Sequence, residues 1–373
     1  MLNILSNRTY RHLFMAQVIA LIGTGLATVA LGLLAYDLAG DRAGAVLGTA
    51  LAIKMSAYIL VAPVAAAFAD KFPRRTMLVT LDLVRALVAI TLPFVTQIWE
   101  IYILIFILQA ASAAFTPTFQ ATIPDILPDE REYTRALSLS RLAYDLESVI
   151  SPMLAAALLT VMSFHNLFAG TAVGFLASAA LVVSVTLPKM KALTVKRSIY
   201  DKTTRGMRIF LKTPRLRGLL ALNMAVAAAS AMVIVNTVVL VQADFGFSQR
   251  STAIALAFFG VGSMVSALVL PRLLDNMSDR MPMLAGTALL VIGLGSGIFL
   301  KDYITLVVLW ALLGVGYSLS QTPGGRLLRR SSTAEDRPAL FAAQFALSHS
   351  CWLVTYPLAG WVGAAWGTQA SFI

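Results

Sequence analysis

The segment FADKFPRRTML, residues 68–78, is a short polar break between two long apolar runs. Four of its side chains are ionisable, and the flanking runs lie at approximately 45–69 and 77–98. Each run is long enough, as a helix, to cross a hydrocarbon core about 30 Å thick. Backbone polar groups inside a bilayer must be satisfied within the helix itself. The segment therefore predicts a tight loop between two transmembrane helices.

The composition extends this interpretation to the whole chain. Of its 373 residues, 58% are hydrophobic and 13% are charged, and the mean hydropathy is +0.80. A soluble globular protein is far less apolar. The apolar runs predict eleven transmembrane helices, at approximately 12–36, 45–69, 77–98, 100–122, 136–160, 163–187, 216–241, 251–272, 283–300, 303–322 and 339–366.

The polar break has a counterpart in the second half of the chain. The segment LLDNMSDRMPML, residues 273–284, matches it at an offset of 205 positions. That offset, or one position more, pairs Asp70 with Asp275, Arg75 with Arg280, Pro152 with Pro357 and Thr116-Pro117 with Thr322-Pro323. One nearly constant offset predicts two parallel repeats. We therefore expect an all-α membrane protein of two six-helix bundles with a pseudo-two-fold repeat, its twelfth helix missing from this chain.

The repeat and the distribution of charge predict the domain organisation and orientation. We expect a bundle at 1–187, a connection with an amphipathic helix at 188–215, and a second bundle at 216–373. With a cytoplasmic N-terminus, the inner loops hold most of the Lys and Arg, whereas the outer loops hold only Arg42, Arg250 and Lys301. This asymmetry favours a multi-pass protein of a bacterial inner membrane, and it explains the net charge of +11 without nucleic acid.

The central connection carries ten Lys or Arg between Lys189 and Arg217. Within it, SIYDKTTRGMRIFL, residues 198–211, places four apolar side chains among basic ones. This pattern fits a short helix on an anionic inner leaflet, or equally a solvated basic linker.

The segments 66–75, 188–215 and the two-fold repeat together resemble the major facilitator superfamily of secondary transporters. The family's loop motif is Gly-x-Leu-Ala-Asp-Arg-x-Gly-Arg-Lys, and residues 66–75 read AAFADKFPRR, with Ala66 and Pro73 in place of the two glycines. NRTYRHLFMAQVIALIGTGLATVALGLLAYDLAG, from Asn7, and RALSLSRLAYDLESVISPMLAAALL, from Arg135, are similar to the nickel-resistance branch of its drug and metal exporters.

The resemblance also implies functional residues. It implies a cytoplasmic charge network that latches a gate, made here of Asp70, Lys71, Arg74, Arg75, Asp82, Arg85 and Arg141. It implies a central cavity lined by helices one, four, seven and ten, with candidates Gln17, Thr24, Thr28, Gln109, Ser112, Thr116, Asn223, Ser230, Asn236, Tyr317, Ser320 and Gln321. Polar side chains in membrane spans also join helices to one another, so only part of this set is expected to touch substrate.

Charges inside a span cost about 2.5–3.5 kcal/mol each on insertion scales, so each needs a partner or a function. Asp82 and Arg85 are three residues apart and can pair on one helix face, as a structural pair or as part of the gate. Lys54 lies in mid-span, where it either snorkels to the interface or faces a cavity that holds anions or a carboxylate.

The fifth predicted helix carries two carboxylates. Arg141 and Asp145 are four residues apart and can pair. Glu147 points about 200° away from Asp145, so the two carboxylates must have separate roles. We favour Glu147 over Asp145 and Lys54 as the proton-coupling residue, against a fixed structural role bonded to a serine or an arginine.

His349 is the one span candidate of the second half, either a packing residue or else a proton carrier or a nickel ligand. The chain has no phosphate-binding Gly-x-x-x-x-Gly-Lys-Ser/Thr and no His-Glu-x-x-His, and Cys351 is its only cysteine. We therefore expect no enzyme activity and no cofactor.

These patterns predict a monomeric, proton-coupled exporter of a divalent metal such as nickel or of an amphipathic drug, working by alternating access. Its partners would be that small molecule or metal ion, protons and the lipid bilayer. The alternatives are a siderophore or metal-chelate exporter and, from another class, a receptor or scaffold that transports nothing.

Overall fold

The computed structural model describes residues 2–39, 43–68, 71–188 and 198–372, and all regular secondary structure in these ranges is helical. The chain divides into two compact units. Unit 1 comprises Met1–Tyr133, Leu146–Lys212 and Arg329–Ala346, and unit 2 comprises Thr134–Asp145, Thr213–Leu328 and Leu347–Ile373.

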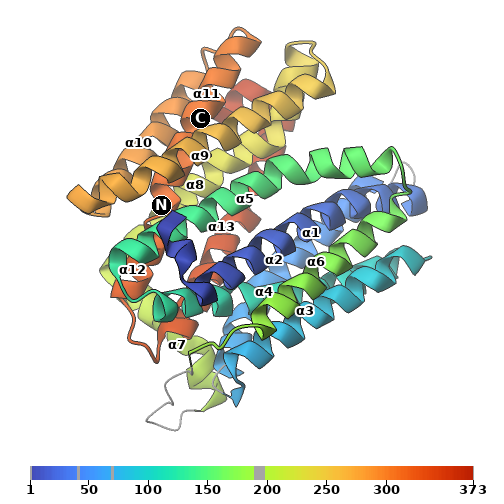
Figure 1. Ribbon diagram of the computed structural model, residues 1–373. Helices are drawn as coiled ribbons and strands as arrows, with labels where there is room; N and C mark the ends of the chain where they lie inside the picture. The colour runs from blue at the N-terminus through green and yellow to red at the C-terminus, as the bar shows by residue number, and fades with distance from the viewer. Residues whose placement is uncertain (1, 40–42, 69–70, 189–197, 373) are drawn as a thin grey trace. The chain divides into compact units, whose positions relative to one another are not determined.

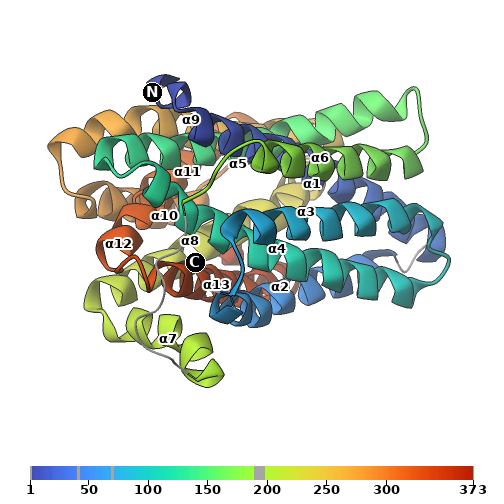
Figure 2. The ribbon, with the colours of Figure 1, turned by 60° about the horizontal axis from the view of Figure 1, so that its bottom comes forward.

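Unit 1 is built around five long helices that form a closed ring (Figures 1 and 2). The neighbouring pairs are α1 with α6, α6 with α3, α3 with α4, α4 with α2, and α2 with α1. Apolar side chains from all five helices, with Phe168 and Phe175 among the fully buried ones, fill the space between them. The helices are α1 (Arg8–Ala39), α2 (Ala43–Phe68), α3 (Arg74–Thr91), α4 (Ile98–Ile126) and α6 (His165–Val183).

Unit 2 repeats three of these neighbour pairs with its own helices, and its fourth pair closes directly where unit 1 has α6. The pairs are α8 with α9, α9 with α11, α11 with α10, and α10 with α8. Its core includes the fully buried Trp310, whose indole N–H donates to Thr237 Oγ1 at 2.8 Å. The helices are α8 (Pro214–Val238), α9 (Gln249–Asn276), α10 (Arg280–Gly297) and α11 (Tyr303–Gln321). The first three pairs correspond to α1 with α2, α2 with α4, and α4 with α3, and they are the structural form of the sequence repeat.

Two helices belong to both units. In α5 (Glu130–Leu159), the segment Thr134–Asp145 lies in unit 2, whereas the first turn and the part from Leu146 onward lie in unit 1. Conversely, α13 (Arg337–Trp366) and the connection before it, from Arg329, lie in unit 1 up to Ala346. The predicted bundles at 1–187 and 216–373 are continuous in sequence, whereas each compact unit includes a segment from the other half of the chain. The division into these two bundles therefore remains a prediction.

Each of the eleven predicted helices overlaps an observed one. The third was predicted to reach residue 98 but ends at Thr91, because Pro93 lacks an amide donor and disfavours helical backbone before it. Nine described helices are long and apolar enough to cross a membrane, and α5 and α13 are not among them. The described chain also contains two short α-helices, α7 (Ile199–Lys212) and α12 (Gly324–Arg330), and the short 3-10 or π-helical segments Leu2–Ser6, Leu92–Phe94, Val239–Asp244 and Thr368–Phe372.

Candidate functional site

The predicted Asp82–Arg85 pair forms inside unit 1, where both side chains are buried. Ser178 of α6 donates its hydroxyl to the second carboxylate oxygen of Asp82 at 2.8 Å. The guanidinium carbon of Arg85 lies 4.1 Å from the ring centroid of Phe115 and 4.5 Å from that of Phe175. The pair is therefore held between α3, α4 and α6, and sequence spacing could not have found the partners on the other two helices.

A second charged cluster joins the beginning of α3 to the end of α4. Arg74 Nη1 lies 2.7 Å from Asp125 Oδ2, and the same carboxylate pairs with Arg337 at the beginning of α13. One carboxylate thus lies between two guanidinium groups. Of the other predicted gate residues, Lys71 is exposed with its ammonium 4.8 Å from the Phe68 ring centroid, Arg75 is exposed, and Asp70 lies outside the described residues.

Unit 2 contains the counterpart of this cluster with the charges exchanged. Arg326 Nε lies 3.0 Å from Asp279 Oδ1, and both side chains are buried. The offset of 205 positions places Asp279 where unit 1 has Arg74. Arg326 follows α11 as Asp125 ends α4. Each unit therefore has an ion pair at the beginning of its third helix, from Arg74 to Asp125 of α4 in unit 1 and from Asp279 to Arg326 of α12 in unit 2, with the charges exchanged.

The segment that begins at Arg329 is anchored to unit 1 by further contacts. Arg329 donates to the carbonyl of Pro128 and lies over the Tyr133 ring at 5.2 Å. Arg330 pairs with Glu130. Arg205 of α7 forms two hydrogen bonds with the Asp336 carboxylate, at 2.5 and 3.0 Å, and these raise the pKa of Arg205 above its usual value.

The amphipathic helix expected in the central connection is α7, and its apolar face packs on protein. Phe210 is fully buried, and α7 contacts α2. Gly206 lies so close to α13 that a Cβ there would overlap the carbonyl of Ala339. Phe210 therefore belongs to the packed interior of unit 1, whereas Ile199 and Leu211 of the same helix are exposed.

The close approach at Gly206 gives a prediction about α7. Gly206→Ala is expected to displace α7 from α13, because the backbone carbonyl of Ala339 cannot move aside like a flexible side chain. Limited proteolysis should then cut the central connection at least several-fold faster. Gly218→Ala is the matched control, since a Cβ there meets no atom within 4 Å. Equal cleavage of the two variants would contradict the packing.

The two carboxylates of α5 lie in different units. Asp145 accepts from Arg141 Nε at 3.0 Å in unit 2, where the guanidinium also covers the Tyr317 ring at 4.5 Å. Glu147 lies in unit 1 against α1, with Oε1 3.2 Å from the position that a Cβ on Gly25 would take. The predicted Arg141–Asp145 pair and the separation of the two carboxylates are confirmed.

Two charged candidates remain, Lys54 and His349. Lys54 is partly buried, with its ammonium 5.7 Å from the Tyr58 ring centroid. His349 is partly buried on α13. In the part of the chain that the structure describes, no three His, Cys, Asp or Glu side chains come together as a metal-binding group. His349 therefore gains no set of co-ligands there.

The cavity candidates differ in how they are satisfied. The hydroxyls of Thr24, Thr28, Ser112 and Ser230 donate to carbonyls one turn earlier in their own helices. Asn236 donates to Ala359 O at 3.2 Å. Gln17 is buried, Gln109, Thr116, Tyr317 and Gln321 are partly buried, and the hydroxyl of Ser320 lies 3.1 Å from that of Thr287.

Asn223 of α8 is the exception among these candidates. Its side chain is buried, and its amide nitrogen has no hydrogen-bond partner among the described residues. Leaving a buried donor unsatisfied costs about 1–3 kcal/mol. Water or a bound solute at this nitrogen would remove that cost.

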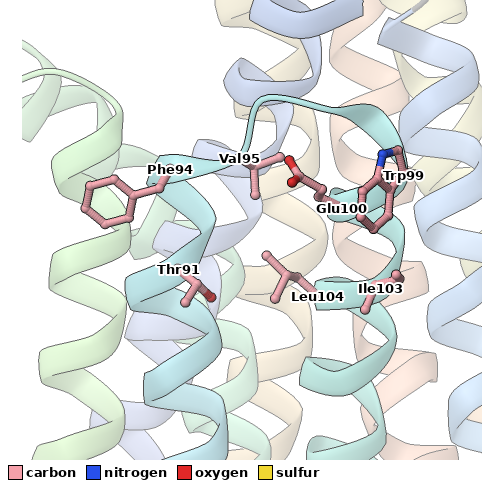
Figure 3. Close-up of a pocket in the computed structure, with 7 residues that line it drawn as sticks. All are labelled: Thr91, Phe94, Val95, Trp99, Glu100, Ile103 and Leu104. Atoms are coloured by element: carbon pink, nitrogen blue, oxygen red, sulfur yellow. The ribbon is translucent and has the colours of Figure 1, made fainter.

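A shallow hollow at the junction of α3 and α4 contains none of the predicted site residues (Figure 3). Glu100 in its wall accepts the backbone amides of Thr96 and Gln97, each at 2.9 Å, and so caps α4. Phe94 and Trp99 are exposed beside it, as aromatic side chains are at a membrane interface. The hollow is therefore not part of the candidate site.

Comparisons with known proteins agree with this architecture. The family model described as Major Facilitator Superfamily matches residues 13–239 and 219–373. The uncharacterized MFS-type transporter YfiS of Bacillus subtilis is 24% identical over 296 residues, which is 76% of this chain and 70% of that protein. Macrolide efflux protein A of Enterococcus faecalis is 25% identical over 154 residues, 39% of this chain and 47% of that protein. The crystal structure of the human organic anion transporter MFSD10 matches with a TM-score of 0.84 at 13% identity, over 98% of this chain and 95% of that chain.

Proposed function

The chain belongs to the major facilitator superfamily of membrane transporters, and we propose that it exports small amphipathic organic compounds in exchange for protons. In this proposal the N-terminus and the α2–α3 connection are cytoplasmic, and the membrane is a bacterial inner membrane. We prefer transport to the receptor or scaffold alternative, since this family is one of transporters.

The choice of substrate rests on two observations. The efflux relative is named for a macrolide, an organic compound. The described residues assemble no metal-binding group around His349. Both favour an organic substrate over nickel or a metal chelate, and nickel stays as one arm of the transport assay.

One observation carries the proton coupling, namely that the two carboxylates of α5 have different surroundings. Asp145 forms an ion pair with Arg141 on the same helix. Glu147 lies close to Gly25 of α1, on a helix that contributes residues to both units. We assign Glu147 as the coupling residue, protonated in one facing state and deprotonated in the other. The Arg74–Asp125–Arg337 cluster would serve as the cytoplasmic latch.

Transport into proteoliposomes under an imposed pH gradient tests this proposal. Glu147→Gln should lower proton-driven export at least about tenfold while leaving exchange of substrate down its own gradient intact. Asp37→Asn is the control, because Asp37 is an exposed acid near the end of α1. Gradient-dependent export that is unchanged in Glu147→Gln would refute the assignment, and export of Ni²⁺ but of no organic compound would refute the substrate class.

A further inference from the structure

We infer that Lys54 binds the negatively charged group of the exported compound, so that the substrates are aromatic organic anions. This inference rests on the proposed export function and adds the charge and shape of the substrate. It assigns a role to the one described lysine in the middle of a membrane-spanning helix.

Lys54 differs from the other cations of the spans in its partners. Arg85 and Arg141 each pair with an aspartate on their own helix. Among the described residues, no carboxylate forms an ion pair with Lys54, and its contact is the ring of Tyr58 at 5.7 Å. A cation–π contact contributes about 0.5–2 kcal/mol, which is less than the roughly 2.5–3.5 kcal/mol that a mid-span lysine costs. Among the described residues, the ammonium therefore has no counter-charge that would offset the cost of its position.

The surroundings of Lys54 are aromatic. The Tyr58 ring lies 4.9 Å from the ring of Phe345, centroid to centroid, within unit 1. Just beyond them, Ala62, Ala113, Ala342 and Phe345 form an apolar cluster between α2, α4 and α13. Lys54 is one helical turn from Tyr58, at the end of this cluster, and remains partly exposed. The ammonium of Lys54 therefore lies beside an aromatic ring and next to an apolar cluster.

This combination matches one class of ligand. A carboxylate or sulfonate would form a charge-assisted hydrogen bond with the ammonium. A ring attached to it would pack against Tyr58, since aromatic pairs gain about 0.5–1.5 kcal/mol beyond their buried area. An organic cation of the same size would be repelled by Lys54. The anionic group of the substrate thus supplies the missing counter-charge.

Two xanthene dyes of similar size and opposite charge test the inference. Fluorescein is anionic and rhodamine 123 is cationic, and the binding of each to the purified full chain in nanodiscs is followed by fluorescence anisotropy. Lys54→Met should weaken fluorescein binding at least tenfold, and Lys54→Arg should retain most of it. Lys301→Met is the matched control, because Lys301 is an exposed lysine before α11.

The other outcomes are decisive as well. Equal fluorescein affinity in Lys54→Met and in the unaltered chain would mean that Lys54 only snorkels to the interface, and would refute its role in binding. Tighter binding of rhodamine 123 than of fluorescein would refute the proposed negative charge of the substrate. Fluorescein should also protect Lys54 of the unaltered chain from chemical acetylation. This measurement does not depend on the folding of any variant. Absence of protection would overturn the inference. Binding that depends on Lys54 without export would instead contradict the proposed function.

Discussion

Arg85→Gln is expected to destabilise the folded protein by about 3–5 kcal/mol, because it leaves the Asp82 carboxylate buried without its counter-charge. Asp82 is fully buried, and Arg85 is enclosed by two aromatic rings. Neither group can turn to water when its partner is lost. Unfolding in mixed micelles with increasing dodecyl sulfate measures the change.

The double variant distinguishes an ion pair from two independent packing residues. Asp82→Asn with Arg85→Gln removes both charges and retains their approximate volumes, so it should be more stable than either single variant. Ser178 still donates to the residue at position 82 in that variant. Additive losses would mean that packing against Phe115 and Phe175, and not the pairing of charges, stabilises this site.

The second large effect is expected from exchanging charges in the two corresponding clusters. Asp279→Arg alone places two buried guanidinium groups together in unit 2 and should cost at least about 3–5 kcal/mol. Adding Arg326→Asp should recover most of the loss, because the pair then has the polarity that unit 1 already uses for Arg74 and Asp125.

The same exchange in unit 1 should fail. Arg74→Asp with Asp125→Arg restores one ion pair but places the new arginine beside Arg337, which loses its carboxylate. We expect both lower stability and at least tenfold slower transport for this double variant than for the exchange in unit 2. Equal recovery in the two units would show that Arg337 does not depend on Asp125.

The parts of the site that the sequence predicted are local in the chain. Arg141 and Asp145 are one helical turn apart, as are Asp82 and Arg85, so helix geometry alone brings them together. Asp125 and Arg337 are 212 positions apart, and no spacing rule relates them. Asp125 was missed because it ends a helix in the apolar context TIPDILPD, where a carboxylate is also a common turn residue.

The fold was more predictable than the site, since hydropathy and the repeat depend on many residues at once. The helices follow from the length of each apolar run, and α5 was found in spite of its charges. What the hydropathy could not show is that α5 and α13 each contribute to both units, because that depends on packing against residues in the other half of the sequence.

That sharing of α5 and α13 means that neither half of the chain contains everything its compact unit needs. The N-terminal half alone would lack Arg329–Ala346, and the C-terminal half alone would lack Thr134–Asp145. A protein made of one repeat with the same feature would be complete only as two copies that exchange this segment, which is domain swapping. Because the two repeats are joined in one chain, the exchange of segments takes place within one molecule. Assembly of the two units therefore does not depend on protein concentration.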